Sequence, residues 1–240
     1  IAFEFGHVAA RAGAKVTILH QGTSPLEHFE TDLVTKLLER TRALGIDVRT
    51  STKVGGIEGA PGQYKVTTSV DGTSEVFDAD LVVHAAGRAP ELDDLDLTTA
   101  GVEFDRRGVR VNGHLQSVSN DAVYAAGDAA NSGGLPETPF ADYEGTVVAR
   151  NILNGNQHTV DYLGMASVVY SIPSLGSVGL TEAAAHGKGL IFTVNQADTS
   201  GWYSARRVAE PTSMYKVLIE KDSGRILGAH LLGPEADEFA

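Results

Sequence analysis

The order of the first elements along the chain is the sequence feature that most constrains its fold. An alanine-rich helical stretch over residues 2–12 closes on Gly13 and is followed by a β-branched run at 15–19. Leucine and valine then recur at helical spacing over 33–44, and residues 46–49 alternate as a strand. Strands that alternate with helices predict a parallel, doubly wound sheet, because parallel neighbours need a crossover helix between them.

The rest of the chain has a different rhythm. Residues 64–68 and 74–77 alternate on either side of Asp71-Gly72, which predicts an antiparallel hairpin. Beyond Asn156 a short helix is expected at 181–186, and the other elements are strands at 168–170, 190–195, 214–220 and 226–232. We therefore expect a second, largely antiparallel domain that begins near residues 155–160.

Two continuous apolar runs, residues 81–87 and 122–128, are typical of strands buried on both faces. The first is followed by Arg88, and the second ends in Gly127-Asp128. Ligands of open α/β sheets bind beyond the carboxyl ends of the strands, so these two ends mark a candidate site. An Asp in this position accepts hydrogen bonds from sugar or polyol hydroxyls. The alternative is that Asp128 only caps a turn.

Two further features add to the candidate site. A helix is predicted from Thr138-Pro139 to about Leu153, with Thr138 as the N-cap and Pro139 at the first helical position. Its free N–H groups would suit an electron-rich oxygen of a cofactor, or they are simply capped. Glu4 lies in an otherwise apolar helical stretch, where a carboxylate needs a cationic partner in a structural ion pair or in a site.

Composition excludes several classes of protein. The net charge of −12 and the pI near 5.0 disfavour nucleic-acid binding. No apolar run approaches the roughly 20 residues of a membrane span. The absence of cysteine excludes a disulfide scaffold, a thiolate zinc site and a cysteine nucleophile among these residues. The eight histidines are dispersed, so no metal site is predicted.

Taken together, these segments resemble the pyridine nucleotide-disulfide oxidoreductases, the flavoprotein family of glutathione reductase, dihydrolipoamide dehydrogenase and mercuric reductase. The helix and second strand of the family's nicotinamide domain are similar to residues 1–5 and 13–19 of this chain. The segment that closes that domain is similar to residues 83–90. The other similar segments are residues 122–128 (second flavin motif), 138–139 (flavin-facing helix start), and 171–182 with 224–233 (dimerisation domain).

The resemblance implies an α/β fold with Rossmann-like nucleotide-binding lobes, followed by an α+β dimerisation domain with an antiparallel sheet. The implied domains are residues 1–88 for NAD(P), 89–157 for the carboxyl-terminal part of the FAD domain, and 158–240 for dimerisation. Both ends of the chain read as interrupted helices. We therefore expect a piece of a longer protein that lacks the amino-terminal flavin lobe and the carboxyl-terminal end.

The resemblance also implies roles for named residues. Asp128 would hold the flavin's ribityl chain, and Thr138 and Pro139 would face the isoalloxazine. Glu4, the one catalytic candidate, would pair with a lysine of the flavin lobe beside the nicotinamide. The other implied cofactor contacts are Gly87 and Arg88 at the nicotinamide, Val54 at the adenine, and His20 and Gln21 at the ribose. Because no acid stands at position 20 and no basic cluster follows, the choice between NAD and NADP stays open.

The implied function is hydride transfer from NAD(P)H to FAD and then to a disulfide, in a cytoplasmic homodimer. Glutathione, lipoamide, mercuric ion and quinone all stay open as substrates. Two alternatives remain: a flavoreductase without redox cysteines that reduces quinones or other small acceptors, and a non-catalytic binding or dimerisation module. Residues 1–240 alone are expected to be inactive and to retain little FAD, because the glycine-rich adenine-binding turn lies in the absent lobe.

Overall fold

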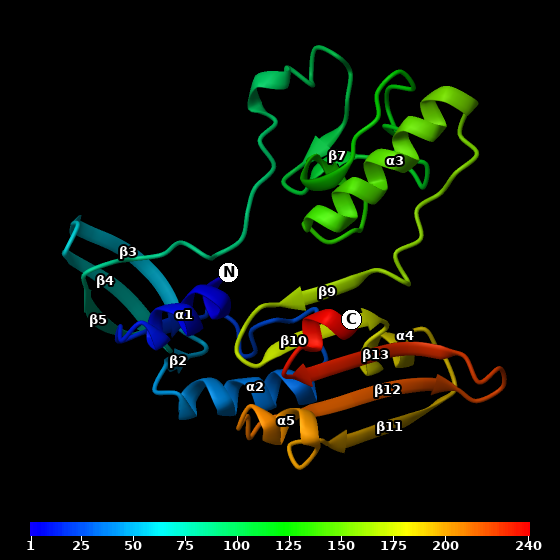
Figure 1. The fold of residues 1–240 in the computed structure, drawn as a ribbon. Helices are drawn as coiled ribbons and strands as arrows, with labels where there is room; N and C mark the ends of the chain where they lie inside the picture. The colour runs from blue at the N-terminus through cyan, green and yellow to red at the C-terminus, as the bar shows by residue number, and fades with distance from the viewer. The chain divides into compact units, whose positions relative to one another are not determined.

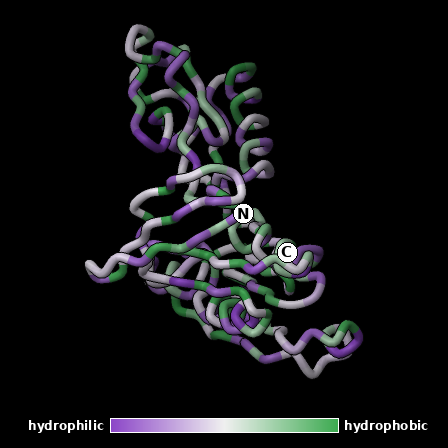
Figure 2. The backbone as a smooth tube through the Cα atoms, turned by 90° about the vertical axis from the view of Figure 1, so that its left-hand side faces the viewer, coloured by the Kyte–Doolittle hydropathy of each residue, from purple (hydrophilic) through white to green (hydrophobic).

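A computed structural model describes residues 1–240 and divides the chain into two compact units (Figure 1). The first unit is discontinuous and joins residues 1–85 to residues 166–240, whereas the second unit is residues 86–165. Hydrophilic and hydrophobic residues are interleaved along the whole backbone (Figure 2), and none of the helices is both long and apolar enough to cross a bilayer.

The first unit opens with the predicted alternation of helices and strands. Its elements are α1 (Ala2–Arg11), β1 (Thr17–Leu19), α2 (Thr31–Ala43) and β2 (Asp47–Arg49). β1 and β2 pair in parallel with Ile18 opposite Val48, which confirms the expected parallel pairing. Phe3 of α1 and Leu33 and Leu37 of α2 are buried with these two strand residues in one core.

A three-stranded antiparallel sheet follows, formed by β3 (Lys53–Ala60), β4 (Gln63–Val70) and β5 (Thr73–Ala79). The predicted hairpin is confirmed, and Asp71 and Gly72 at its turn both have positive φ, 48° and 82°. β3 was not predicted from the sequence, because glycines at three of its eight positions remove the alternation that identifies a strand.

Residues 166–240 form a five-stranded antiparallel sheet in the order β11-β12-β13-β10-β9. The antiparallel sheet and four of its strands were predicted, whereas β10, which contains two glycines, was missed. Its strands are β9 (Ala166–Val169), β10 (Ser174–Gly179), β11 (Phe192–Asp198), β12 (Met214–Glu220) and β13 (Ile226–Gly233). Three short helices accompany it: α4 (Glu182–Gly187), α5 (Tyr203–Arg207) and α6 (Ala236–Phe239). Val169, Leu175 and Leu232 belong to the same core as the residues of α1 and α2, so the two ends of the chain close one hydrophobic core.

The second unit contains one long helix and little sheet. Its elements are η1 (Asp93–Leu95), β6 (Phe104–Asp105), β7 (Gly108–Arg110), η2 (Gly127–Ala129), β8 (Ala130–Asn131) and α3 (Thr138–Asn154), where η marks a 3₁₀ turn. β7 pairs with β6 antiparallel and with β8 in parallel. Leu92, Val102 and Val109 form its small core.

Three local predictions were wrong. Residues 81–87 form no strand, and Leu81 and Val83 are 66% and 42% exposed. Residues 122–128 form only one isolated bridge, from Gln116 to Tyr124, before the 3₁₀ turn. An apolar run becomes a strand only where neighbouring strands take up its N–H and C=O groups. No strand lies beside the first run, and the second meets only the short segment 115–117. The N-cap of α3 is Glu137 rather than Thr138, so Thr138 and Pro139 lie in the first turn.

Candidate functional site

The turn at Gly127 and Asp128 approaches α3 very closely. Gly127 has φ 61°, and a Cβ atom built there would lie 2.9 Å from the Cβ of Ala141, so only glycine fits without a shift. Asp128 follows in the 3₁₀ turn, partly exposed, with one oxygen 3.6 Å from Nε of the exposed Arg88. The carboxylate of Asp128 is therefore held by the turn and remains open to a ligand.

The first turn of α3 lies next to the Gly127-Asp128 turn. Thr138 and Pro139 begin this helix turn, and Ala141, which meets Gly127, lies two residues after Pro139. The first N–H groups of a helix have no partner within it and carry the positive end of the helix dipole. The structure thus brings together four of the predicted site residues, Arg88, Asp128, Thr138 and Pro139.

A buried carboxylate on α3 supports the same turn. Glu144 is 1% exposed, and its Oε2 accepts a hydrogen bond from the N–H of Gly127 at 2.6 Å. Its Oε1 accepts two more, from the hydroxyl of Ser132 at 2.6 Å and from that of Tyr162 at 2.5 Å. Burial and the bond to Glu144 raise the pKa of Tyr162, so this hydroxyl stays protonated and donates.

Glu144 was not singled out from the sequence, although a signal was present. The buried residues of α3 are Phe140, Glu144, Val147 and Asn151, which recur at helical spacing. An acidic residue on such a face needs hydrogen-bond or charge partners, as was expected for Glu4.

Glu4 lies on α1 in the other unit. Its Oε1 accepts a hydrogen bond from the N–H of Tyr170 at 3.1 Å. This bond fixes Glu4 to the segment that follows β9.

The residues predicted to read the nucleotide lie together just after β1. The carbonyl of His20 accepts a hydrogen bond from the N–H of Thr52 at 2.9 Å, which places His20 and Gln21 beside the start of β3, where Val54 is exposed. The Nε2 of His20 is 3.1 Å from the carbonyl of Ser24. Gly87 and Arg88 belong to the other unit.

A second buried charge, also not predicted from the sequence, lies in the first unit. Lys216 of β12 is 2% exposed. Its Nζ lies 2.9 Å from a carboxylate oxygen of Glu30 and 2.7 Å from one of Asp32, and it also contacts Glu182. Burial would lower the pKa of Lys216, but the hydrogen bonds to the three carboxylates outweigh burial and raise it. The ammonium group of Lys216 therefore occupies the position between these three carboxylates that a metal ion could otherwise take.

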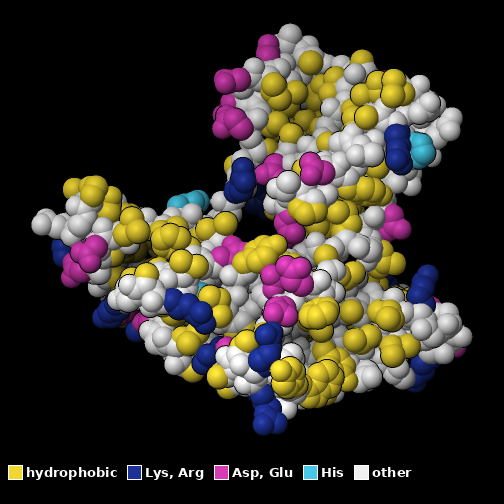
Figure 3. All heavy atoms as spheres, in the orientation of Figure 1, with side chains coloured by type: hydrophobic (Ala, Val, Ile, Leu, Met, Phe, Trp, Pro, Cys, Tyr) yellow, Lys and Arg dark blue, Asp and Glu magenta, His cyan; other side chains and the backbone are white.

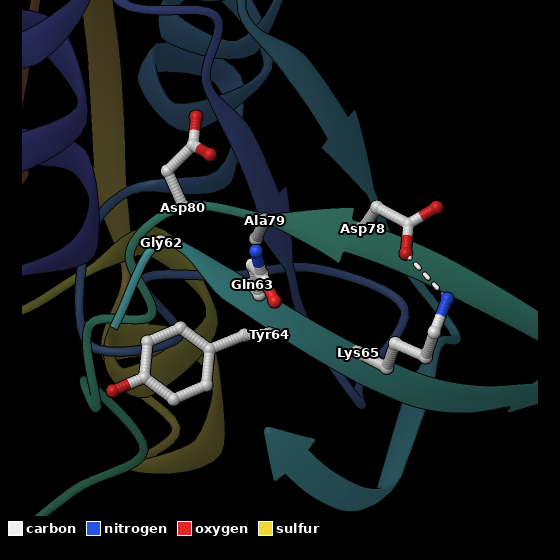
Figure 4. A pocket seen from close by; sticks show the side chains of 7 residues that line it. All are labelled: Gly62, Gln63, Tyr64, Lys65, Asp78, Ala79 and Asp80. Carbon is white, nitrogen blue, oxygen red and sulfur yellow. Dashed lines mark hydrogen bonds and ion pairs between the residues drawn. The ribbon is translucent and has the colours of Figure 1, made fainter. Parts of the chain in front are cut away.

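A pocket lies along the ladder between β4 and β5, lined by residues 62–65 and 78–80. Figure 4 shows Lys65 and Asp78 paired across the strands. The Nζ of Lys65 lies 2.8 Å from a carboxylate oxygen of Asp78, and both side chains are exposed. None of the predicted site residues lines this pocket.

Comparison with known proteins follows the same division of the chain. Residues 1–148 match the family model described as pyridine nucleotide-disulphide oxidoreductase, and residues 165–240 match the dimerisation domain of that family. A protein of the Staphylococcus aureus mercuric resistance operon is 44% identical over 145 residues, which is 60% of this chain and 81% of that protein. The dihydrolipoyl dehydrogenase of Bacillus subtilis is 31% identical over 240 residues, all of this chain and 50% of the enzyme.

Solved structures show the same fold. The HOCl-induced flavoprotein disulfide reductase RclA of Escherichia coli aligns with a TM-score of 0.80 at 24% identity, over 98% of this chain and 53% of RclA. LpdA of Mycobacterium tuberculosis aligns with a TM-score of 0.83 at 18% identity, over 98% of this chain and 50% of LpdA. The chain thus spans about half the length of the dehydrogenases and reductases that it matches. It belongs to the pyridine nucleotide-disulphide oxidoreductase family, whose members use FAD and NAD(P)H.

Proposed function

We propose that this chain is the part of a flavin-dependent oxidoreductase that presents NAD(P)H to FAD and supplies one side of the flavin site. In the whole enzyme, hydride passes from NAD(P)H to FAD and from there to a disulfide. The observation that carries the proposal is the exposed carboxylate of Asp128, held on the Gly127 turn beside the first turn of α3.

The donors and acceptors at this turn fit a flavin. The carboxylate of Asp128 accepts hydrogen bonds from the ribityl hydroxyls, and Arg88 is held so weakly that it need not compete. The N–H groups of the first turn of α3, at Thr138 and beyond, face an electron-rich edge of the ring. FAD, when bound, supplies the electron chemistry, while these residues bind and orient it.

The nicotinamide cofactor is assigned to the first unit. His20 and Gln21 are assigned to the ribose because they lie just beyond the end of β1, and Val54 is assigned to the adenine because it is exposed at the start of the neighbouring β3. Glu4, which the N–H of Tyr170 holds in place, serves as the catalytic partner of a lysine from the flavin lobe. Gly87 and Arg88 are further proposed contacts of the nicotinamide.

The proposed domains are residues 1–88 for NAD(P), 89–157 for the flavin and 158–240 for dimerisation. Figure 3 shows hydrophobic side chains at the surface over α5 and the strands β11 to β13, where Val194, Trp202 and Tyr203 are among the exposed residues. A face of this kind suits a two-fold contact with a second copy. We place the homodimer in the cytoplasm.

The acceptor is proposed to be a disulfide substrate. This chain has no cysteine, so the redox pair that relays electrons to such a substrate lies outside residues 1–240. Steady-state rates of the full-length enzyme with lipoamide, glutathione disulfide, mercuric ion and a quinone distinguish the acceptors. Activity with the quinone alone would contradict a disulfide substrate.

The flavin site is tested by Asp128→Ala in the full-length protein. We expect FAD to bind about tenfold to a hundredfold more weakly, because hydrogen bonds to a charged group contribute about 1.5–3 kcal/mol. Flavin retained after dialysis and fluorescence titration measure the change. Asp142→Ala, an exposed position on the same helix, is the matched control. An unchanged flavin content in the Asp128 variant, with lowered stability instead, would mean that Asp128 only caps its turn.

A further inference from the structure

Glu144 is an unusual residue for its position. Its neighbours on the buried face of α3 include Phe140 and Val147, and a leucine would suit that packing. A buried carboxylate is costly unless it is paired or fully hydrogen-bonded, and Glu144 has no cationic partner in the structure. All three of its hydrogen bonds come from neutral donors. The residue therefore does something at this position that an apolar side chain would not do.

The two oxygens of Glu144 hold different segments. Oε2 accepts from the N–H of Gly127, the residue directly before Asp128. Oε1 accepts from Ser132, whose hydroxyl oxygen in turn accepts the N–H of Gly134 at 3.1 Å. A Cβ atom at Gly134 would lie 2.7 Å from Oε1, so the loop at 132–134 is built against this oxygen.

Tyr162 completes the arrangement from beyond α3. Its hydroxyl donates to Oε1 of Glu144, and its ring packs on Phe140 with the centroids 5.6 Å apart. One side chain thus ties together the turn before Asp128, the loop that leads to α3, and a segment 18 residues further along the chain.

We propose that Glu144 is a positioning residue for the flavin site, which fixes the Gly127-Asp128 turn against α3 so that the carboxylate of Asp128 is oriented before FAD arrives. The proposal rests on the proposed function, since it assigns to Asp128 the role of flavin ligand. Glu144 itself touches no cofactor. Its effect on FAD passes through the N–H of Gly127 and the loop at 132–134.

The experiment compares variants of the full-length flavoprotein. Glu144→Leu removes every acceptor, whereas Glu144→Gln keeps a carbonyl oxygen for the N–H of Gly127. Asn151→Leu is the matched control, because Asn151 is buried on the same face of α3 but bonds to His114 and His158, away from the turn. FAD affinity, the visible circular dichroism of the flavin, amide exchange at residues 127–134 and thermal unfolding are measured for each variant.

We expect Glu144→Leu to weaken FAD binding about tenfold, to alter the flavin dichroism and to speed amide exchange at residues 127–134. Glu144→Gln should recover much of the affinity. Asn151→Leu should lower thermal stability and leave affinity and dichroism unchanged. If Glu144→Leu does not fold, the inference is tested with Glu144→Gln and Tyr162→Phe. For both variants we expect smaller changes in flavin dichroism and amide exchange, in the same direction as for Glu144→Leu.

Two results would overturn the inference. One is unchanged amide exchange and FAD affinity in the Glu144 variants while Asp128→Ala does lose FAD, in which case only the role of Glu144 is wrong. The other is a loss of FAD in Asn151→Leu equal to that in Glu144→Leu, which would make Glu144 merely structural. An Asp128→Ala variant that binds FAD normally would instead remove the proposed function, and this inference with it.

Discussion

Each unit of this protein contains a buried charged side chain with several partners, and these two side chains are stabilised in opposite ways. Glu144 in the second unit is surrounded by neutral donors, one peptide N–H and two hydroxyls. Lys216 in the first unit is surrounded by three carboxylates, those of Glu30, Asp32 and Glu182. The anion is thus held by dipoles, whereas the cation is held by an excess of opposite charge.

The difference matters when a partner is lost. Removal of Lys216 would leave acids, among them the buried Glu30, facing one another without a cation, and buried unpaired charge is among the most destabilising changes in proteins. Removal of Glu144 leaves only unsatisfied dipoles, which costs less. Both charges join segments that are distant along the chain, so each is better explained by the orientation of those segments than by a gain in stability.

Lys216→Met should have the largest effect. We expect the free energy of unfolding of the first unit to fall by about 3–5 kcal/mol, because the methionine side chain fills the space but neutralises none of the carboxylates. Urea denaturation followed by far-UV circular dichroism measures it. Lys221→Met, at an exposed position one residue beyond β12, is the control and should change stability by less than about 0.5 kcal/mol. A small loss in Lys216→Met would show that water or relaxation screens the acids.

Glu144→Leu should have an intermediate effect, about 1–3 kcal/mol on the stability of the second unit, because the buried N–H of Gly127 and two hydroxyls lose their acceptor. Amide exchange of residues 86–165 reports this unit separately from the first. A loss of stability as large as that of Lys216→Met would contradict the expectation that unsatisfied dipoles cost less than unpaired buried charges.

Acidification should have the smallest effect and should act on the first unit. Burial lowers the pKa of both His7 and His230, although the carbonyls of Ile172 and Leu180 partly oppose this. The unfolded chain then binds more protons than the folded one as the pH falls below about 6.5, so stability declines in that window and is restored above it. NMR titration of the two imidazoles is the measurement. Ordinary titration near 6.5 at both sites would contradict the prediction.

Helices and strands that follow from local periodicity and turn residues were predicted correctly. Segments whose structure depends on pairing with a strand far away in the sequence were not. The α3 helix, the hairpin at Asp71-Gly72 and four of the five antiparallel strands at the carboxyl end follow from periodicity and turn residues within a few positions. The apolar run at 81–87 carries an equally strong pattern but has no strand to pair with in this chain, and local sequence contains no information about that.

The candidate site shows the same limit. Asp128 was identified because a Gly-Asp pair after an apolar run is a local signal. The partners of Glu144 are 12 to 18 residues away, and the salt-bridge partners of Lys216 are up to 186 residues away. A charged residue on an apolar helix or strand face can be recognised from the sequence. Its hydrogen-bond and salt-bridge partners cannot, because folding brings them from distant positions in the chain.

The discontinuity of the first unit has a consequence for synthesis on the ribosome. Its core joins Phe3 and Leu33 to Leu175 and Leu232, and His7 accepts a hydrogen bond from the N–H of Ile172 at 3.1 Å. The helices α1 and α2 therefore emerge long before the strands that cover them, while residues 86–165 are already complete. Closure of so long a loop is slow, and the nascent helices keep an uncovered apolar face until it occurs. Until residues 166–240 are made, this exposed apolar face makes the growing chain prone to aggregation.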